Sequence, residues 1–272
     1  MTSTSAEIRL RDEMMMGAGF LALVFIFAGC ARWPEKLAES HKASAPGAIQ
    51  LARESLDAMG GARAWLDTGY MRFTFVVDAP GREPSKIHHW WDRRTGRYRV
   101  EYMDGPAKIT ALLNINTREG RAWRNNETLQ GADLSGVLQK AYGRYINDTY
   151  WLLAPSKLLD PGVVLSDEGT GLGPDGKTEY RVIHASFRDV GLTPKDNYWF
   201  YVNPKTKIVE HWKFILKGGA GPASGYSWED WRKVGPLLMC ETHRQEGGER
   251  AIRFEDLEAA SRVPDEMIFT AP

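Results

Sequence analysis

The chain changes its hydrophobic period several times, and these changes predict its secondary structure. Residues 47–59 repeat apolar positions at helical spacing, and Gly60 follows where a helix commonly ends in a left-handed residue. Further along, apolar residues alternate with charged ones, as Tyr98, Val100 and Tyr102 do. Such alternation is typical of antiparallel strands that bury one face and expose the other.

The alternation stops once, in the middle of the chain. Helical spacing returns over residues 134–145, and Asp148 or Thr149 is placed to cap a second short helix that ends at Leu153. Alternating segments then resume over residues 163–257. The whole pattern predicts a mainly β fold with about eleven antiparallel strands and a few helices.

An uninterrupted apolar run covers residues 14–27, and Ala28, Gly29 and Cys30 close it. A helix that spans a bilayer needs about 20 apolar residues, whereas the apolar core of a secretory signal has roughly 7–15. Small residues before a cysteine are typical of a bacterial lipoprotein signal, in which the cysteine receives lipid. The sequence therefore predicts a signal peptide over residues 1–29 and lipidation of Cys30. An ordinary secretory signal or a buried amphipathic terminus are the alternatives.

The remainder is predicted to form a tether and a single domain. Residues 30–46 are polar and rich in small residues, as in a spacer between a membrane and a domain. Residues 47–272 fit one β domain, since such units often have about 200–250 residues, although two small domains would also account for the length.

Composition and charge exclude one class of partner. Hydrophobic residues make up 43% of the chain, which is enough for a core. Lys+Arg 35 and Asp+Glu 35 balance to a net charge of zero, whereas nucleic-acid binding needs a concentrated basic surface. We therefore expect no nucleic-acid partner. If Cys30 carries lipid, Cys240 has no partner for a disulfide.

Polar residues give weak signals for catalysis or metal binding. His88 and His89 are neighbours on a predicted strand, so their side chains point to opposite faces. His184, His211 and His243 lie on separate strands, and no HExxH or CxxC spacing occurs. The sequence predicts no catalytic residues, no metal site and no cofactor.

Several stretches resemble one family. They are residues 56–61 (LDAMGG), 151–158 (WLLAPSKL), 198–206 (YWFYVNPKT) and 228–231 (WEDW). With the order of helices and strands, they resemble uncharacterised outer-membrane lipoprotein-sorting-like proteins of the LolA/LolB-like lipoprotein-localisation-factor superfamily. The resemblance implies an open, curved antiparallel half-barrel with helices in its concave face and a hydrophobic ligand held between sheet and helices.

The predicted inner surface of this sheet is rich in aromatic residues. A sheet with an aromatic concave face must cover that face, and short helices can leave a cavity that accepts an acyl chain at about 0.8 kcal/mol per buried CH₂. A dry core, in which these side chains pack against one another, is the alternative. The predicted lining residues of a hydrophobic ligand site are Phe73, Phe75, Tyr98, Val100, Tyr102, Tyr142, Tyr145, Tyr198, Phe200, Trp212 and Phe214.

These features together predict a membrane-anchored lipoprotein of the bacterial envelope that binds or carries a lipid or an acylated protein. A structural or interaction lipoprotein with a self-filled core, and an envelope enzyme of unfamiliar type, are the alternatives. The expected partners are a lipid or acyl-chain ligand, the membrane through lipidated Cys30, and an envelope protein. Ala31 follows the cysteine, and by the family resemblance the absence of aspartate there favours the outer membrane, with the domain facing the periplasm.

Overall fold

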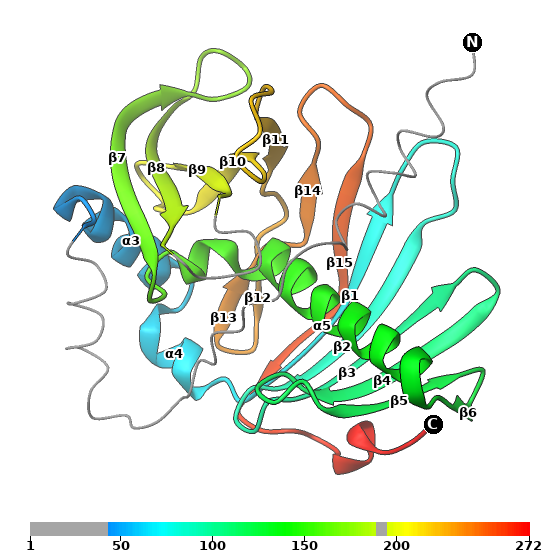
Figure 1. The fold of residues 1–272 in the computed structure, drawn as a ribbon. Coiled ribbons are helices and arrows are strands. Elements are labelled where there is room, and N and C mark those ends of the chain that lie inside the picture. Colours follow the sequence, from blue (N-terminus) through cyan, green and yellow to red (C-terminus); the bar gives the residue numbers. More distant parts are fainter. Residues whose placement is uncertain (1–42, 189–194) are drawn as a thin grey trace, which may run out of the picture.

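The computed structural model describes residues 43–188 and 195–272 (Figure 1). The predicted signal peptide, Cys30 and most of the predicted tether lie outside these ranges. Two hydrogen bonds join the first described residues to the domain. Ala45 N donates to Leu165 O at 2.8 Å, and Leu165 N donates to Ser44 Oγ at 3.0 Å. Within the described ranges, no helix is both long enough and apolar enough to cross a membrane.

Three α-helices are described: α3 (Pro46–Ala58), α4 (Gly61–Asp67) and α5 (Gly131–Leu153), with the 3-10 turns η1 (Ala154–Lys157) and η2 (Glu266–Phe269). The predicted first helix is confirmed as α3. Gly60 separates it from α4 with φ of +116°, and a Cβ at this position would lie 2.8 Å from Pro236 O. The turn therefore needs glycine both for its backbone conformation and for space.

The larger sheet has eight antiparallel strands in the order β14-β15-β1-β2-β3-β4-β5-β6. Their bounds are β1 (Tyr70–Asp78), β2 (Ser85–Asp92), β3 (Arg97–Asp104), β4 (Ala107–Asn114), β5 (Gly120–Arg124), β6 (Glu127–Thr128), β14 (Thr242–Arg244) and β15 (Ala251–Ala260). β1 pairs with β15, and Phe75 lies opposite Phe254. Two strands from opposite ends of the described chain are thus neighbours, so the sheet forms only when both ends are in place.

The smaller sheet has five antiparallel strands in the order β11-β10-β9-β8-β7, and β12 pairs with β13 in a separate hairpin. The bounds are β7 (Val163–Leu172), β8 (Glu179–Phe187), β9 (Asn197–Val202), β10 (Val209–Ile215), β11 (Ser224–Ser227), β12 (Arg232–Val234) and β13 (Leu237–Met239). Trp212 lies opposite Phe200 across the hairpin connection over 203–207. A register shift lies between Val209 and His211, and Val209 is fully buried.

The predicted fold class, a mainly β structure of open antiparallel sheets, is confirmed. The described residues form fifteen strands, more than the expected number of about eleven. The difference comes from short strands such as β6, and from breaks in the segments over 226–231 and 237–244. Asp230 has φ of +56°, which no extended strand adopts, so the chain leaves β11 before it enters β12.

α5 is one continuous helix of 23 residues, and the prediction of two separate helices with a cap at Asp148 or Thr149 is wrong. Asp148 is not a cap, because it lies fully buried against the larger sheet. Buried positions continue without a phase change from Val137 and Ala141 to Leu152. The sequence signal for a helix cap at Asp148 is therefore overridden by a tertiary contact with a residue far away in the sequence.

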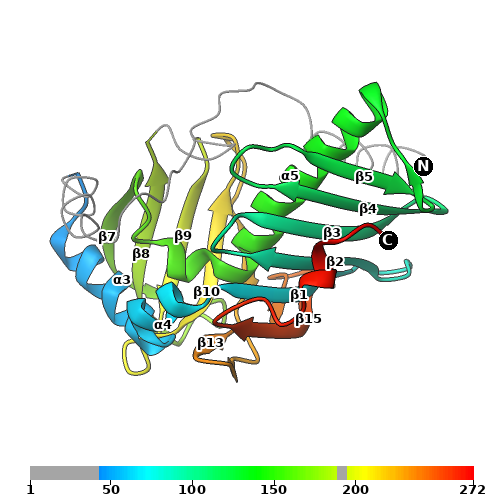
Figure 2. The ribbon, with the colours of Figure 1, turned by 90° about the horizontal axis from the view of Figure 1, so that it is seen from below.

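α5 crosses one face of the larger sheet and reaches the smaller sheet near its C-terminal end (Figures 1 and 2). We call the faces that are turned toward α5 the inner faces of the two sheets. Buried apolar residues form two clusters, one on the inner face of each sheet, and Trp151 of α5 packs against both. A single helix thus joins the two cores.

We expect Gly143→Ala to stabilise the protein. Gly143 lies within α5, and a Cβ there would meet no atom within 4 Å. Alanine favours the helix over glycine by about 1 kcal/mol, so thermal unfolding should shift upward by roughly 2–4 °C. Gly60→Ala is the matched control and should lower the unfolding temperature, since its φ is positive and its space is filled. A lower unfolding temperature for Gly143→Ala would contradict the position of this residue in α5.

Candidate functional site

The predicted lining residues all lie on the inner faces or on α5, but in two groups. Phe73, Phe75, Tyr98, Val100, Tyr102, Tyr142 and Tyr145 belong to the cluster between the larger sheet and α5. Tyr198, Phe200, Trp212 and Phe214 belong to the cluster on the smaller sheet. The structure therefore places them around α5 and does not gather them into one surface. Trp151 is the residue through which the two groups touch.

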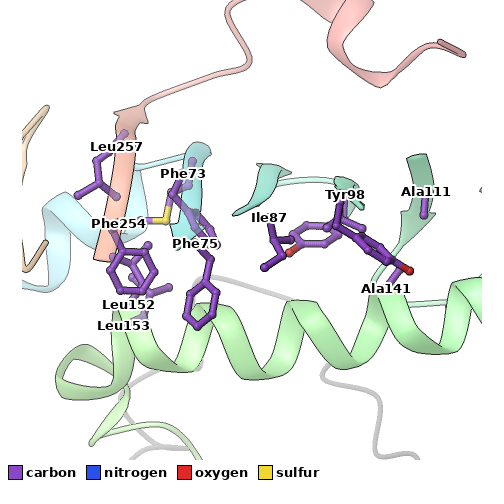
Figure 3. Packing of buried hydrophobic residues seen from close by; sticks show 14 of the residues in the cluster. Phe73, Phe75, Ile87, Tyr98, Ala111, Ala141, Leu152, Leu153, Phe254 and Leu257 are labelled. Carbon is purple, nitrogen blue, oxygen red and sulfur yellow. The ribbon is translucent and has the colours of Figure 1, made fainter. Parts of the chain in front are cut away.

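The space between the larger sheet and α5 is filled by side chains. Figure 3 shows residues of β1, β2 and β3 pointing toward α5. The rings of Tyr98 and Tyr145 meet edge to face at 5.1 Å, and Phe73 and Phe254 do so at 5.9 Å. A cavity at the C-terminal end of α5 has a volume of about 10 Å³, room for about one water. In this conformation the first group of lining residues forms a dry core.

The aromatic layer is less tightly covered where α5 passes from one sheet to the other. Tyr150, Trp151, Phe187 and Phe214 are half-buried there, and we call these four residues the aromatic rim. Trp151 meets Phe214 at 5.8 Å between ring centroids, and Tyr150 meets Phe187 at 6.4 Å. These four residues are more exposed than the fully buried rings beside them, such as Trp212.

Of the four rim residues, only Phe214 is among the predicted lining residues. Tyr150 and Trp151 fall in the segment that the sequence predicts as a separate short helix, which gives no indication of their position on the inner face. Phe187 ends β8, and its ring meets Tyr198 at 5.8 Å. The sequence signal for this position was the adjacent pair Tyr150 and Trp151 in a helical stretch. One long helix that crosses two sheets must place large side chains between them.

A buried polar chain connects α5 to the larger sheet. Nε2 of His89 lies 3.2 Å from Oδ2 of Asp148, and both side chains are 0% exposed. Nδ1 of His89 makes a short contact with the hydroxyl of Tyr98, and the imidazole stacks on Phe73 at 4.4 Å. Burial lowers the pKa of His89, although Asp148 opposes this effect. Burial also raises the pKa of Tyr98 well above its usual value.

The directions of these two pKa shifts show where the protons of Tyr98 and His89 lie. Tyr98 keeps its hydroxyl proton and donates it to Nδ1 of His89. The neutral imidazole then carries its own proton on Nε2, which faces the carboxylate of Asp148. Full burial keeps all three groups from contact with solvent, so in this conformation they position α5 and meet no substrate.

A second buried histidine lies under the same stretch of α5. His243 is 0% exposed, its Nδ1 donates to Ser227 O at 3.0 Å, and its ring lies 5.6 Å from the ring of Trp151. Burial lowers the pKa of His243 to about 3. Asp148 and Trp151 are three residues apart in α5, so both histidines contact one short segment of the helix.

An open cleft of about 530 Å³ lies beside the smaller sheet. Its walls combine carboxylates with aromatic rings: Pro174, Asp175, Tyr180, Glu210, His211, Ser227, Trp228, Glu229, Asp230 and Trp231. Burial lowers the pKa of His211 to about 4, and Nε2 lies 3.4 Å from Oε2 of Glu246. Among the described residues, no group of three or more His, Cys, Asp or Glu side chains is arranged to hold a metal. None of the predicted lining residues borders this cleft.

No family model and no curated protein matches the chain. Solved structures are similar to it, and two of them are described here. One is a LolA superfamily protein from Nitrosomonas europaea, 12% identical, with a TM-score of 0.47, over 82% of this chain and 97% of that chain. The other is a DUF1329 family protein from Desulfovibrio piger, 10% identical, with a TM-score of 0.47, over 82% of this chain and 96% of that chain. The first belongs to the superfamily that the sequence motifs resemble, and both likenesses concern the fold alone.

We expect Asp148→Ala to destabilise the protein by about 1–3 kcal/mol, because it leaves the buried imidazole N–H of His89 without an acceptor. Asp104→Ala is the matched control. It removes an exposed ion pair that also joins α5 to the larger sheet, in which Lys140 Nζ lies 3.4 Å from Asp104 Oδ2. Exposed pairs contribute only about 0–1 kcal/mol. Urea unfolding of both variants measures the difference, and equal losses would contradict a buried pair at Asp148.

Proposed function

We propose that this protein is a membrane-anchored lipoprotein of the bacterial envelope that binds a lipid or another hydrophobic ligand between its sheets and α5. The proposal rests on one observation, which is how the helices cover the inner faces of the two sheets. α5 covers the larger sheet, α3 and the C-terminal end of α5 share the cover of the smaller sheet, and this cover leaves the aromatic rim only partly buried. An apolar molecule can extend this contact by displacing α5 side chains, and each CH₂ that it buries contributes about 0.8 kcal/mol.

The dry packing under α5 favours a second candidate function. If the inner faces remain filled by their own side chains, the protein is a structural or interaction lipoprotein that binds an envelope protein through its surface. The two candidates differ in one measurable respect. A carrier holds an apolar molecule that leaves when the protein unfolds, whereas a scaffold does not.

The full chain, expressed in a bacterial envelope and purified natively, should retain a hydrophobic ligand. We expect a mass in the native spectrum that disappears on denaturation and that organic solvent extracts as a lipid. The purified protein should also bind a fluorescent fatty acid in competition with the extracted lipid. A protein free of ligand that fails to bind the fatty acid would exclude the carrier function and leave the scaffold.

Binding of the fluorescent fatty acid should depend on the aromatic rim. Phe214→Ala removes a half-buried ring that contacts Trp151 and Tyr226. We expect the Kd to rise about tenfold because this apolar contact is lost. Trp199→Ala is the matched control, because Trp199 is half-buried on the other face of the same sheet, where it stacks on His184. If the two substitutions raised the Kd equally, the fatty acid would bind at a site other than the aromatic rim.

Cys30→Ser should release the protein from membranes and leave the domain folded. The thiol that would carry the lipid is lost, and stable attachment requires about two acyl chains. Fractionation of cell envelopes, together with circular dichroism of the purified variant, measures both expectations. Retention of Cys30→Ser in the outer-membrane fraction would contradict lipid anchoring at this residue.

A further inference from the structure

We propose that the hydrophobic ligand carries an acidic head, and that Arg144 of α5, Arg124 of β5 and the hydroxyl of Tyr102 on β3 bind this head beside the helix. The head is a carboxylate or a phosphate ester, since both present the same anionic oxygens to a guanidinium group. The inference deepens the proposed function and rests on it, because it names the chemical class of the ligand. We call these three residues the acid-head site.

Tyr102 supplies a polar atom that the packed layer leaves without a partner. Tyr102 is 8% exposed and belongs to the cluster between the larger sheet and α5. Its hydroxyl is buried, and no described residue forms a hydrogen bond with it. Burial raises the pKa of Tyr102 to about 12, so the hydroxyl keeps its proton and can donate it to an acceptor on a ligand.

Two guanidinium groups lie near this hydroxyl. Cζ of Arg144 is 6.0 Å from the centroid of the Tyr102 ring. Arg144 and Arg124 are both close enough to oppose the effect of burial on the pKa of Tyr102. Among the residues that the structure describes, no carboxylate lies within ion-pair distance of either guanidinium. Two positive charges beside a hydroxyl that lacks an acceptor are a combination that suits an anion.

The carboxylates of this neighbourhood do not neutralise the two arginines. Asp104 is paired with Lys140, whose Nζ lies 3.4 Å from Oδ2, and Asp148 faces a buried imidazole at 3.2 Å. Glu127 lies opposite Arg124 in the pairing of β5 with β6, and the charged groups of these two described residues are farther apart than an ion pair. Arg144 and Arg124 therefore keep their capacity to bind an anion from outside the chain.

The register of the larger sheet places two members of the acid-head site on one face. Tyr102 lies opposite Ile109 of β4, and Ile109 lies opposite Arg124. Directly paired residues of antiparallel strands point to the same face, so Arg124 shares the inner face with Tyr102. Arg144 approaches the same ring from α5. Two strands and the helix thus direct their polar groups to one place.

An acyl chain attached to a head at this place can run toward the aromatic rim. Arg144 and Trp151 are seven residues apart in α5, so they lie on the same side of the helix and about 10 Å apart along its axis. This side of the helix leads from a charged residue to an aromatic one, as the two ends of an amphiphile require. The acid-head site would fix one end of the ligand, and the rim would contact its chain.

Displacement of the fluorescent fatty acid from the full chain tests the class of ligand. At neutral pH, palmitic acid and methyl palmitate have the same chain and differ in the charge of the head. We expect palmitate to bind at least about tenfold more tightly, because hydrogen bonds to a charged group are stronger than those to a neutral one. Equal affinities would overturn the acid-head site.

Inorganic phosphate separates the head of an amphiphile from a free anion. We expect phosphate to displace the fluorescent fatty acid at least about a hundredfold less effectively than palmitate, since phosphate has no chain to bury. Phosphate that was as effective as palmitate would show a site for a free anion and would overturn the assignment to an amphiphile.

Substitutions test the two arginines. Arg144→Gln and Arg124→Gln should each raise the Kd of palmitate about tenfold and leave that of methyl palmitate unchanged, and Arg144→Lys should restore part of the affinity because it keeps the charge. Arg121→Gln is the matched control. Arg121 lies on the same strand as Arg124 but on the other face, where its guanidinium lies 5.5 Å from the ring of Trp123.

Two results would overturn the role of the arginines. An equal loss of palmitate and methyl palmitate binding in Arg144→Gln would show that this residue acts through the structure of α5 and not through the head. An effect of Arg121→Gln as large as that of Arg124→Gln would show general attraction between opposite charges without a specific site.

Tyr102→Phe separates binding from stability. It removes only a buried hydroxyl that has no partner, so the ligand-free variant should unfold at the temperature of the wild type or above it. The Kd of palmitate should nevertheless rise about tenfold, because the head loses a donor. A lower unfolding temperature or an unchanged Kd would overturn the role of the hydroxyl.

These measurements distinguish failure of the acid-head site from failure of the proposed function. If palmitate and methyl palmitate bind equally well, the protein remains a carrier and only the acid-head site is overturned. If neither of them binds, the carrier function and the acid-head site are overturned together.

Discussion

The structure depends on covering the aromatic inner faces of two open sheets. Neither sheet closes on itself, so large rings such as Tyr98 and Trp212 would face water without a cover. α5 supplies that cover for the larger sheet, and α3 and the C-terminal end of α5 supply it for the smaller one. Removal of water from these rings and from the aliphatic side chains packed beside them holds the helix in place.

Burial of polar groups in the same layer opposes this stabilisation. His89, Asp148 and Tyr98 each lose contact with water, and only part of their hydrogen-bonding capacity is restored. Such a contact adds little net stability, because the cost of burying the polar groups offsets most of their attraction.

This balance connects the two candidate functions. With α5 in place, the inner faces are a dry core, which is what a scaffold requires. With α5 displaced, the same side chains become an apolar surface between two sheets, which is what a carrier requires. Displacement of α5 would uncover the larger sheet, whereas α3 would still cover part of the smaller one. Trp151 is the one residue of α5 that packs against both cores.

The sequence by itself determined the longer alternating strands, the first helix and the aromatic character of the inner faces, because hydrophobic period and turn residues act locally. The predicted lining residues accordingly lie on the inner faces or on α5. Only the tertiary structure decided that α5 is continuous, that Asp148 turns toward His89, and that the lining divides into two clusters. These features depend on contacts between segments far apart in the chain. A local pattern records which face of an element is apolar but not which element will cover it.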